Sequence, residues 1–301
     1  MEPKVLVIVL TYNGVALTLD CLASLREVGY PALDVAVVDN ASTDSTPQIV
    51  RTHFPEVLVI ETGANLGYAE GNNVGMRHAL AHGYDYVLLL NNDTEVASQA
   101  VSVLVAACEA QPDIGVAGPK VLYYDRPDLL YSAGGRIDWG RGKTHMLGID
   151  QPDAPPYDQP ADVDFVNGCA LLARSSAIAQ AGLLDPRFGM YFEETEWCVR
   201  IARHGWRIHY TPTSRILHKV DPLKQDWSPR IAYYMTRNRL LFLRLTGAPL
   251  RAWIDAVLFQ DLRTWVSWTV KPKWRHRGPQ RAAMIDAWRD FMRGNLGMAA
   301  R

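Results

Sequence analysis

The stretch Val87–Asp93 changes within one residue from four apolar side chains to two amides and a carboxylate. An uninterrupted apolar run of this length is typical of a strand buried on both faces of a parallel sheet. Ligands of such sheets bind beyond the carboxyl ends of the strands, where Asn91, Asn92 and Asp93 would emerge. A carboxylate there can hold a divalent cation that keeps water and phosphate oxygens as its other ligands. The same residues also fit a turn or cap before a helix over Thr94–Glu109, so the stretch alone leaves both interpretations open.

Other polar residues could complete such a site. The carboxylate of Asp39 could accept a hydrogen bond from a base imide or a ribose hydroxyl. The imidazole of His218 suits manganese as a second protein ligand, although a histidine in a strand is more often structural. The acidic run Glu193–Glu196 opens an expected helix, where carboxylates commonly complement the helix dipole. Because neighbouring helical side chains lie about 100° apart, these carboxylates need not share one role, and one of them could act as a general base.

Strand and helix patterns alternate four times over the first 110 residues. The expected strands are Lys4–Leu10, Val35–Val38, Val57–Ile60 and Val87–Leu90. Helical patterns follow them, ending near residues 28, 53, 82 and 110, the last over Val96–Ala110. This alternation predicts an α/β fold with a doubly wound, mostly parallel sheet flanked by helices. The polar turns begin at Thr11, Asp39, Asn65 and Asn91. Because all four follow strands, we expect them to converge on one sheet edge and form a site.

The pattern is less regular after residue 114. Strand-like segments are expected at Val116–Tyr123, Leu130–Ile137, Val163–Leu172, Arg207–Tyr210 and Arg215–His218. The Pro- and Asp-rich stretch 151–160 predicts a surface loop, and helical periodicity runs from about residue 228, with breaks at Pro249 and Pro272. We therefore divide the chain into a catalytic domain at 1–223 and a basic, Trp-rich helical C-terminal region at 224–301. The first would comprise a nucleotide-binding half at about 1–118 and an acceptor half at about 119–223.

The composition is that of a globular protein. Of 301 residues, 48% are hydrophobic and 21% are charged, which allows a sizeable core and argues against wholesale disorder. The sequence shows no secretory leader and no run of roughly 20 apolar residues, so we expect neither an exported chain nor a spanning helix. The four cysteines are far apart and lack metal-ligand spacing, which indicates reduced thiols and a cytoplasmic location.

Charge is distributed unevenly along the chain. Residues 224–301 carry 15 Lys and Arg against 5 Asp and Glu, whereas the rest carries 16 against 27. Five tryptophans alternate with the basic residues there: Trp253, Trp265, Trp268, Trp274 and Trp288. Amphipathic helices of this composition could contact an anionic membrane. A helical subdomain packed on the core, or a homodimer contact, explains them equally well. No nucleic-acid reader motif is recognised, so we expect no nucleic-acid partner.

The chain resembles the inverting family 2 glycosyltransferases of the GT-A fold, in their bacterial rhamnosyltransferase-like branch. The resemblance covers about residues 4–245. It rests on six segments in this order: Thr11-Tyr12-Asn13, Val38–Asp44, Asn65–Asn73, Asn91-Asn92-Asp93, Phe192–Arg200 and Tyr233–Arg239. It implies transfer of a sugar, with rhamnose favoured, from a dTDP- or UDP-linked donor to a glycan or lipid-linked acceptor. Such a reaction belongs to cell-envelope polysaccharide synthesis and would take place in the cytoplasm, at the inner face of the membrane.

The same resemblance implies roles for individual residues. The nucleotide pocket would be formed by Thr11, Tyr12, Asn13, Asp39, Asn40, Ser42, Asn65, Gly67, Asn72 and Asn92. Asp93, with His218 as the second protein ligand, would hold Mg²⁺ or Mn²⁺. Glu194 would be the catalytic base, with Glu193 and Glu196 as supporting acidic residues.

The sequence departs from the family pattern at two places. Asn91 replaces the first Asp of the common Asp-X-Asp, and Glu194 replaces a frequent Asp, which moves the carboxylate by about 1.5 Å. Two other functions remain open. A sugar-phosphate nucleotidyltransferase would want a glycine-rich basic loop where Thr11-Tyr12-Asn13 stands. A non-catalytic nucleotide- or glycan-binding module would keep Asp39 without needing Glu194.

Overall fold

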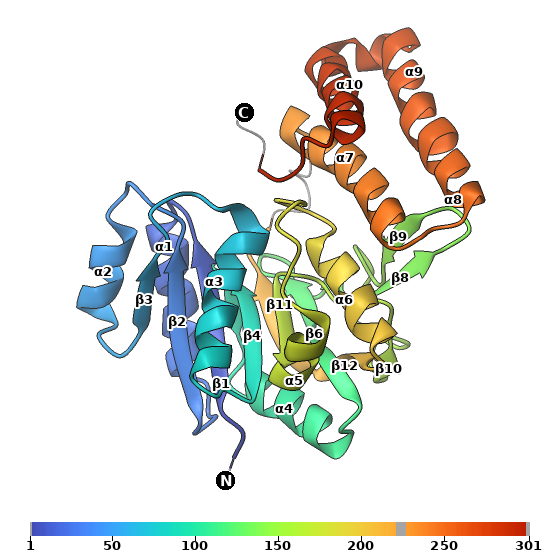
Figure 1. Ribbon diagram of the computed structural model, residues 1–301. Coiled ribbons are helices and arrows are strands. Elements are labelled where there is room, and N and C mark those ends of the chain that lie inside the picture. Colours follow the sequence, from blue (N-terminus) through green and yellow to red (C-terminus); the bar gives the residue numbers. More distant parts are fainter. Residues whose placement is uncertain (1, 221–226, 299–301) are drawn as a thin grey trace.

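The computed structural model describes residues 2–220 and 227–298. A central sheet lies between two layers of helices, and the helices α7–α10 stand beyond one end of it (Figure 1). The strands are β1 (Val5–Thr11), β2 (Leu33–Asp39), β3 (Leu58–Glu61), β4 (Tyr86–Asn91), β5 (Thr94–Val96), β6 (Ile114–Tyr123), β7 (Leu130–Ser132), β8 (Gly135–Asp138), β9 (Lys143–Met146), β10 (Ala161–Asp162), β11 (Ala170–Arg174) and β12 (Arg207–His218). The α-helices are α1 (Val15–Arg26), α2 (Thr46–His53), α3 (Gly67–Ala81), α4 (Ala100–Ala110), α5 (Ser175–Ala181), α6 (Glu193–Arg203), α7 (Pro229–Leu245), α8 (Leu250–Ile254), α9 (Arg263–Val270) and α10 (Gly278–Arg293). A π-helical segment η2 (Asp255–Leu262) joins α8 to α9, and a 3₁₀ segment η3 (Pro272–Arg277) precedes α10.

The strand order of the main sheet is β10-β12-β6-β11-β4-β1-β2-β3, with β5 attached to β12 and β7 to β6. Strands β3, β2, β1 and β4 are parallel, and β11 runs antiparallel between β4 and β6. The predicted mostly parallel, doubly wound sheet is therefore confirmed. Because the chain winds outward from β1 through β2 and β3 and then returns to β4, the order reverses beside β1. Such a reversal opens a crevice at the carboxyl ends of the strands.

Side chains alternate between the two faces of the parallel strands and build one core on each face. Leu6 and Ile8 of β1 pack with residues of α3, α5 and α6. Val5, Val7 and Val9 of the same strand pack with residues of α1, α2 and α4. Burial on both faces explains why these strands read as continuous apolar runs.

The second half of the sheet differs in detail from the sequence prediction. The expected strand Val163–Leu172 is interrupted, because the Asn167 side chain accepts a hydrogen bond from the Cys169 backbone N–H and turns the chain before β11. The two expected strands Arg207–Tyr210 and Arg215–His218 are the ends of the single strand β12. This strand stays paired with β6 across a register shift between Thr211 and Arg215.

Two other expected segments are also divided. The predicted helix over Val96–Ala110 starts only at Ala100, because residues 94–96 form β5 and pair with β12. The expected strand Leu130–Ile137 is split into β7 and β8 at Gly134, whose φ of 79° lies in the left-handed region.

The C-terminal helices share a core with the sheet layer. Leu241, Phe242 and Leu243 of α7 belong to the same buried cluster as Leu6 and Ile8. The expected boundary between residues 223 and 224 lies outside the described residues. Within the described chain, no helix combines the length and apolar character that crossing a membrane requires.

The tryptophans of this region do not form the exposed face that their alternation with basic residues suggested. Trp253, Trp265, Trp268, Trp274 and Trp288 are all half-buried. Trp253 packs on Phe291, with ring centroids 6.1 Å apart, and Trp288 donates a hydrogen bond to Asp261. The indole rings therefore mainly join these helices to one another.

Candidate active site

The turns after β1 and β2 are joined at the carboxyl edge of the sheet. The backbone N–H of Asn13 donates to Ser42 Oγ at 2.8 Å, and Asn13 Oδ1 accepts from the backbone N–H of Thr43 at 2.7 Å. Asn13 and Ala41 have φ values of 50° and 62°, so both turns use left-handed backbone that is uncommon outside glycine. Beside them the ring of Tyr12 is 51% exposed and lies free for a planar ligand.

Two buried acceptor atoms stand at the end of β2. The carboxylate of Asp39 is buried, and its Oδ2 accepts from the backbone N–H of Ser42 at 2.9 Å. The side chain of Asn40 donates to the carbonyl of Gly67 at 3.0 Å. Asp39 Oδ1 and Asn40 Oδ1 have no hydrogen-bond partner among the described residues. Buried acceptors are normally satisfied, so these two atoms are suited to N–H or O–H donors of a ligand.

The glycine-rich segment Asn65–Asn73 lies beside the end of β2. Asn65 Oδ1 accepts from the backbone N–H of Gly67 at 3.0 Å, and Gly67, with a φ of 75°, starts α3. The backbone N–H of Tyr68 donates to the carbonyl of Gly189, which joins this loop to the segment before α6. Asn72 lies farther along α3, is buried, and donates to the Tyr68 carbonyl. Asn65 and Gly67 therefore shape the loop, and Asn72 bonds mainly to its own helix.

The motif Asn91-Asn92-Asp93, at the end of β4, lies at the same edge of the sheet. The amide of Asn92 donates to Thr11 Oγ1 at 3.3 Å and to Thr18 Oγ1 at 3.1 Å, which joins β4 to β1 and α1. Asp93 Oδ1 lies 3.2 Å from Nε2 of His218, 125 residues later in the chain. The four polar turns thus meet at one edge, as their positions after strands predicted.

The carboxylate of Asp93 is held in its ionised form. Burial raises its pKa, but hydrogen bonds from His218 and from the Asn91 side chain, together with the charge of His218, outweigh burial, so the net shift is downward. Asn91, which stands where the family has an Asp, thus acts as a hydrogen-bond partner of Asp93. The ring of Tyr131 packs edge-on against His218, with centroids 4.7 Å apart, and fixes the imidazole.

A divalent cation fits this pair. One carboxylate and one imidazole form a mixed oxygen and nitrogen set that manganese accepts, and magnesium also takes a single carboxylate together with phosphate oxygens. Over residues 2–220 and 227–298, no group of three or more His, Cys, Asp or Glu side chains converges as a complete protein cage. Asp93 and His218 would therefore hold a cation together with oxygens of a bound diphosphate.

Glu193 and Glu194 are the first two residues of α6. Glu193 is buried, and its Oε2 has no hydrogen-bond partner among the described residues. Burial, followed by the charge of Glu194, raises the pKa of Glu193 well above its ordinary value. Burial also raises the pKa of Glu194, but backbone N–H groups and Thr195 oppose that shift. Of the two carboxylates Glu194 therefore ionises more readily, which is the property required of a base.

Cys169 lies near both Asp93 and Glu194. Burial raises the pKa of its thiol well above the ordinary range, and the charges of Asp93 and Glu194 both raise it further. A Cβ added to the preceding residue, Gly168, would lie 3.4 Å from Cγ of Glu194 and 2.9 Å from the hydroxyl of Tyr68. Asp93 and Glu194 therefore both lie close to Cys169, and Glu194 also lies close to Gly168 and Tyr68.

Glu196 points elsewhere. Its carboxylate pairs with the guanidinium of Arg200 one helical turn later, at 3.0 Å, and Arg200 also donates to the carbonyls of Ala181 and Leu183. These contacts fasten α6 to the segment that follows α5. Glu196 therefore contributes to the placement of the helix.

Two residues of α7 hold the segment before α6 and were not predicted as site residues. The amide of Asn238, which is fully buried, donates to the carbonyls of Phe188, Met190 and Tyr191 at 2.9, 2.6 and 2.9 Å. Arg237 donates to the Phe188 carbonyl at 2.7 Å. Both residues lie in the segment Tyr233–Arg239, which the family resemblance had singled out without a role, and that segment was the available signal.

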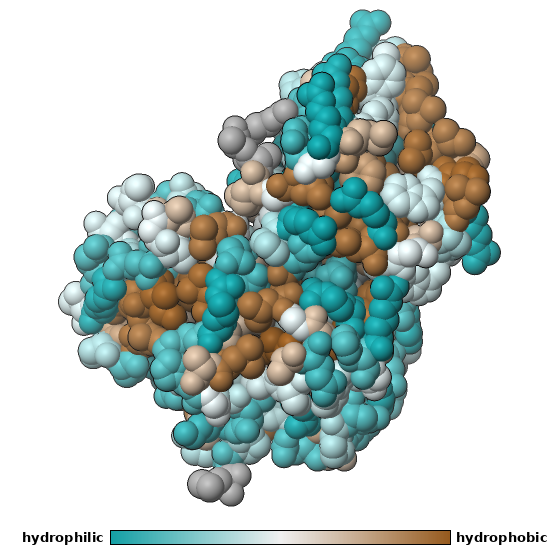
Figure 2. All heavy atoms as spheres, viewed as in Figure 1, coloured by the Kyte–Doolittle hydropathy of each residue, from teal (hydrophilic) through white to brown (hydrophobic). Residues whose placement is uncertain are grey.

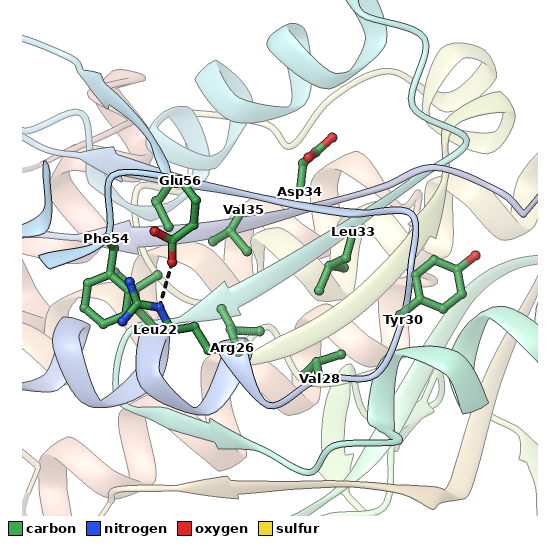
Figure 3. Close-up of a pocket in the computed structure, with 11 residues that line it drawn as sticks. Leu22, Arg26, Val28, Tyr30, Leu33, Asp34, Val35, Phe54 and Glu56 are labelled. Carbon is green, nitrogen blue, oxygen red and sulfur yellow. Dashed lines mark hydrogen bonds and ion pairs between the residues drawn. The ribbon is translucent and has the colours of Figure 1, made fainter.

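A cavity of about 320 Å³ at the other edge of the sheet is separate from this site (Figure 3). It lies between the end of α1 and the start of β2, and Arg26 and Glu56 pair across it at 2.7 Å. Leu33, one of its lining residues, pairs with Val5 at the beginning of the parallel strands, whereas Thr11 and Asp39 pair at their end. The amino and carboxyl ends of the strands thus hold different features, and the polar turns at Thr11 and Asp39 lie at the carboxyl ends.

Known proteins resemble this chain in sequence. Residues 6–178 match the model of the family described as glycosyl transferase family 2. The N-acetylglucosaminyl-diphospho-decaprenol L-rhamnosyltransferase of Mycobacterium tuberculosis is 30% identical over 257 residues, which cover 76% of this chain and 82% of that protein. The dTDP-rhamnosyl transferase RfbF of Shigella flexneri is 23% identical over 272 residues, covering 88% of each chain.

Solved structures share the fold. The mannosyltransferase PcManGT from Pyrobaculum calidifontis, in complex with GDP-Man and Mn²⁺, superposes with a TM-score of 0.59 at 19% identity, covering 97% of this chain and 88% of that one. The S. aureus TarS fragment 1–349 in complex with UDP-GlcNAc gives 0.62 at 16% identity, over 96% and 81%. The expected GT-A architecture is thereby confirmed. The extent of the family match and the rhamnosyltransferase relatives agree with the sheet and its polar edge, and the chain belongs to glycosyl transferase family 2.

Proposed function

We propose that the chain is an inverting, metal-dependent glycosyltransferase that moves a sugar, with rhamnose favoured, from a dTDP- or UDP-linked donor to the hydroxyl of a lipid-linked or glycan acceptor. The proposal is supported chiefly by the proximity of both Asp93 and Glu194 to Cys169, whose thiol pKa both charges raise, and by the end of β2 at Asp39 beside the end of β1 at Thr11. Two relatives are named as rhamnosyltransferases, and one of them is named for a decaprenol-linked acceptor. These names support the choice of sugar and of acceptor class.

The donor nucleotide would bind at the ends of β1 and β2. The free Oδ1 atoms of Asp39 and Asn40 would accept from the base or the ribose, and Tyr12 would offer its exposed ring. Asp93 and His218 would hold the cation against the diphosphate. A divalent cation bound there supplies positive charge that stabilises the departing diphosphate.

Glu194 would perform the proton transfer. As the acceptor oxygen forms its bond to the anomeric carbon, the Glu194 carboxylate takes the hydroxyl proton, and the bond from that carbon to the diphosphate oxygen breaks with its electron pair leaving on the diphosphate. Attack from the face opposite the leaving group inverts the anomeric configuration in one displacement. The protonated Glu193 would leave the negative charge of the pair on Glu194.

The test is Glu194→Gln, which keeps the length of the side chain and removes its basicity. We expect transfer to fall by at least about a hundredfold while the dTDP or UDP affinity, measured by calorimetry with Mn²⁺, stays unchanged. Glu27→Gln is the matched control, because Glu27 is exposed at the end of α1, and it should keep full activity. NMR of the product should show the anomeric configuration opposite to that of the donor. Full activity of Glu194→Gln, or retained configuration, would contradict the mechanism.

A further inference from the structure

The helical segment 250–270 presents its apolar side chains to solvent. Every fourth residue is apolar. The leucines and the isoleucine are 42–74% exposed, and the valines are 41–67% exposed. These six residues are Leu250, Ile254, Leu258, Leu262, Val266 and Val270. We call these six residues the outer stripe. Figure 2 shows hydrophobic residues along the outer edge of the segment that Figure 1 labels α8 and α9. Phe259, which is 60% exposed, widens this surface.

The π-helical turns keep the outer stripe on one side. In an α-helix a four-residue repeat rotates by about 40° at each step and would wind around the helix. The η2 segment closes wider i→i+5 turns, which rotate less per residue and bring the repeat back. The stretch of π-helix between α8 and α9 therefore aligns the six apolar positions. Turns of π-helix are rare in proteins, and those that occur often lie at functional sites.

The orientation of this segment is fixed by its polar inner face. Asp261 is fully buried, pairs with Arg239 of α7, and accepts from Trp288 Nε1 at 3.1 Å. Ala252 and Ala256 are buried on the same side. Turning the outer stripe toward the core would break these contacts and leave the Asp261 charge buried without its partner, which is strongly unfavourable. The stripe is therefore held outward by the fold.

Exposed basic side chains follow the outer stripe in the sequence. Lys271, Lys273 and Arg275 follow Val270 directly and are exposed, and the exposed charges within the segment itself are Arg251 and Arg263. Apolar side chains beside cations are the composition that binds anionic lipid headgroups and the acyl chains beneath them. We propose that the outer stripe and this basic end lie on the surface of an anionic membrane. The proposal rests on this surface and not on the proposed reaction, although a lipid-linked acceptor would be available at such a place.

The experiment is flotation of the full chain with phosphatidylcholine vesicles, with and without phosphatidylglycerol. We expect binding to the anionic vesicles at low salt, and a fall of about tenfold or more in the partition coefficient for Leu258→Gln/Leu262→Gln, because two partly exposed leucines no longer transfer from water. The matched control is Leu58→Gln/Leu80→Gln, which changes leucines that are 41% and 36% exposed on β3 and α3. This control should bind as the unchanged chain does.

A second variant tests the charge and does not touch the helix packing. Lys271→Gln/Lys273→Gln/Arg275→Gln should lower the partition coefficient by about fivefold for each charge removed and should flatten its salt dependence. The proposal is overturned if the unchanged chain fails to bind anionic vesicles at low salt, or if Leu258→Gln/Leu262→Gln binds equally well. It is also overturned if light scattering shows a dimer that this leucine variant dissociates, since the stripe would then face a second copy. Donor hydrolysis should be equal in the unchanged chain and in all these variants. If the unchanged chain does not hydrolyse the donor, only the proposed reaction is refuted.

Discussion

Asn238 offers a direct test of how α7 supports the reaction. Its amide donates to the carbonyls of Phe188, Met190 and Tyr191, which form the segment directly before Glu193. Asn238→Ala would leave these three acceptors without the amide, and the site is fully buried, so water replaces the lost bonds poorly. A buried polar group that loses its partner costs about 1–3 kcal/mol. Because the amide has two N–H groups for three carbonyls, one N–H is shared between two of them, and we expect a total loss of about 2–4 kcal/mol in the free energy of unfolding.

The same variant should separate binding from catalysis. The segment 188–191 directly precedes Glu193 and Glu194, whereas Thr11, Asp39 and Asn92 follow or end β1, β2 and β4. The segment contacts the nucleotide loop through the Tyr68 N–H, which donates to the Gly189 carbonyl and not to a residue that Asn238 holds. We expect kcat for transfer to fall by about tenfold or more and the KM for the donor to change little. Chemical denaturation measures the first effect, and steady-state kinetics measures the second.

Asn295→Ala is the matched control, because Asn295 is exposed and its amide makes one hydrogen bond, to Asp290 at 3.2 Å. This variant should lose less than about 0.5 kcal/mol of stability. If Asn238→Ala unfolds at the same denaturant concentration as the unchanged chain and keeps its kcat, the three carbonyl contacts do not support the site and this reasoning is wrong.

Two further predictions concern charge. The raised pKa of Glu193, caused first by burial, means that the folded chain favours the protonated form, so the stability that this carboxyl contributes is present below pH about 4 and is lost as pH rises through the folded pKa. Thermal unfolding of Glu193→Gln should therefore match the unchanged chain at pH 4 and exceed it by several degrees at pH 8; equal midpoints at pH 8 would count against a buried carboxylate. Asp93→Asn should abolish the Mn²⁺-dependent part of the rise in Tm that UDP or dTDP produces, because an amide holds the cation poorly, and an undiminished Mn²⁺ effect would remove Asp93 from the metal site.

The first half of the fold and the polar edge could be predicted because their determinants are local. The run Val87–Leu90 is apolar without a break because β4 lies between β1 and β11 and is covered on both faces. The polar residues that follow each strand must then emerge at a shared edge, and the hydrogen bonds of Asn92 and Asn13 confirm it. Periodicity and turn chemistry suffice for this conclusion.

The remaining features depend on contacts between distant residues. Nothing near Val96 in the sequence indicates that residues 94–96 pair with β12 rather than start a helix, because that partner lies more than 100 residues later. The two halves of β12 could not be joined across Pro212 without the neighbouring strand β6. The half-buried positions of Trp253 and Trp288 likewise follow from contacts with Phe291 and Asp261, which a pattern of aromatic and basic residues does not determine.

The structure also explains why an enzyme of this type needs helices beyond its sheet. Tyr191 and Phe192 are consecutive non-glycine residues with φ values of 68° and 73°, and each such residue costs on the order of 1–3 kcal/mol. This strained turn starts α6, whose first two residues are Glu193 and Glu194. The buried bonds from Asn238 and Arg237 are of comparable size and offset the strain. The position of Glu194 is therefore determined jointly by contacts with Gly168 and Tyr68 and by α7, so the C-terminal helices help to orient the proposed base.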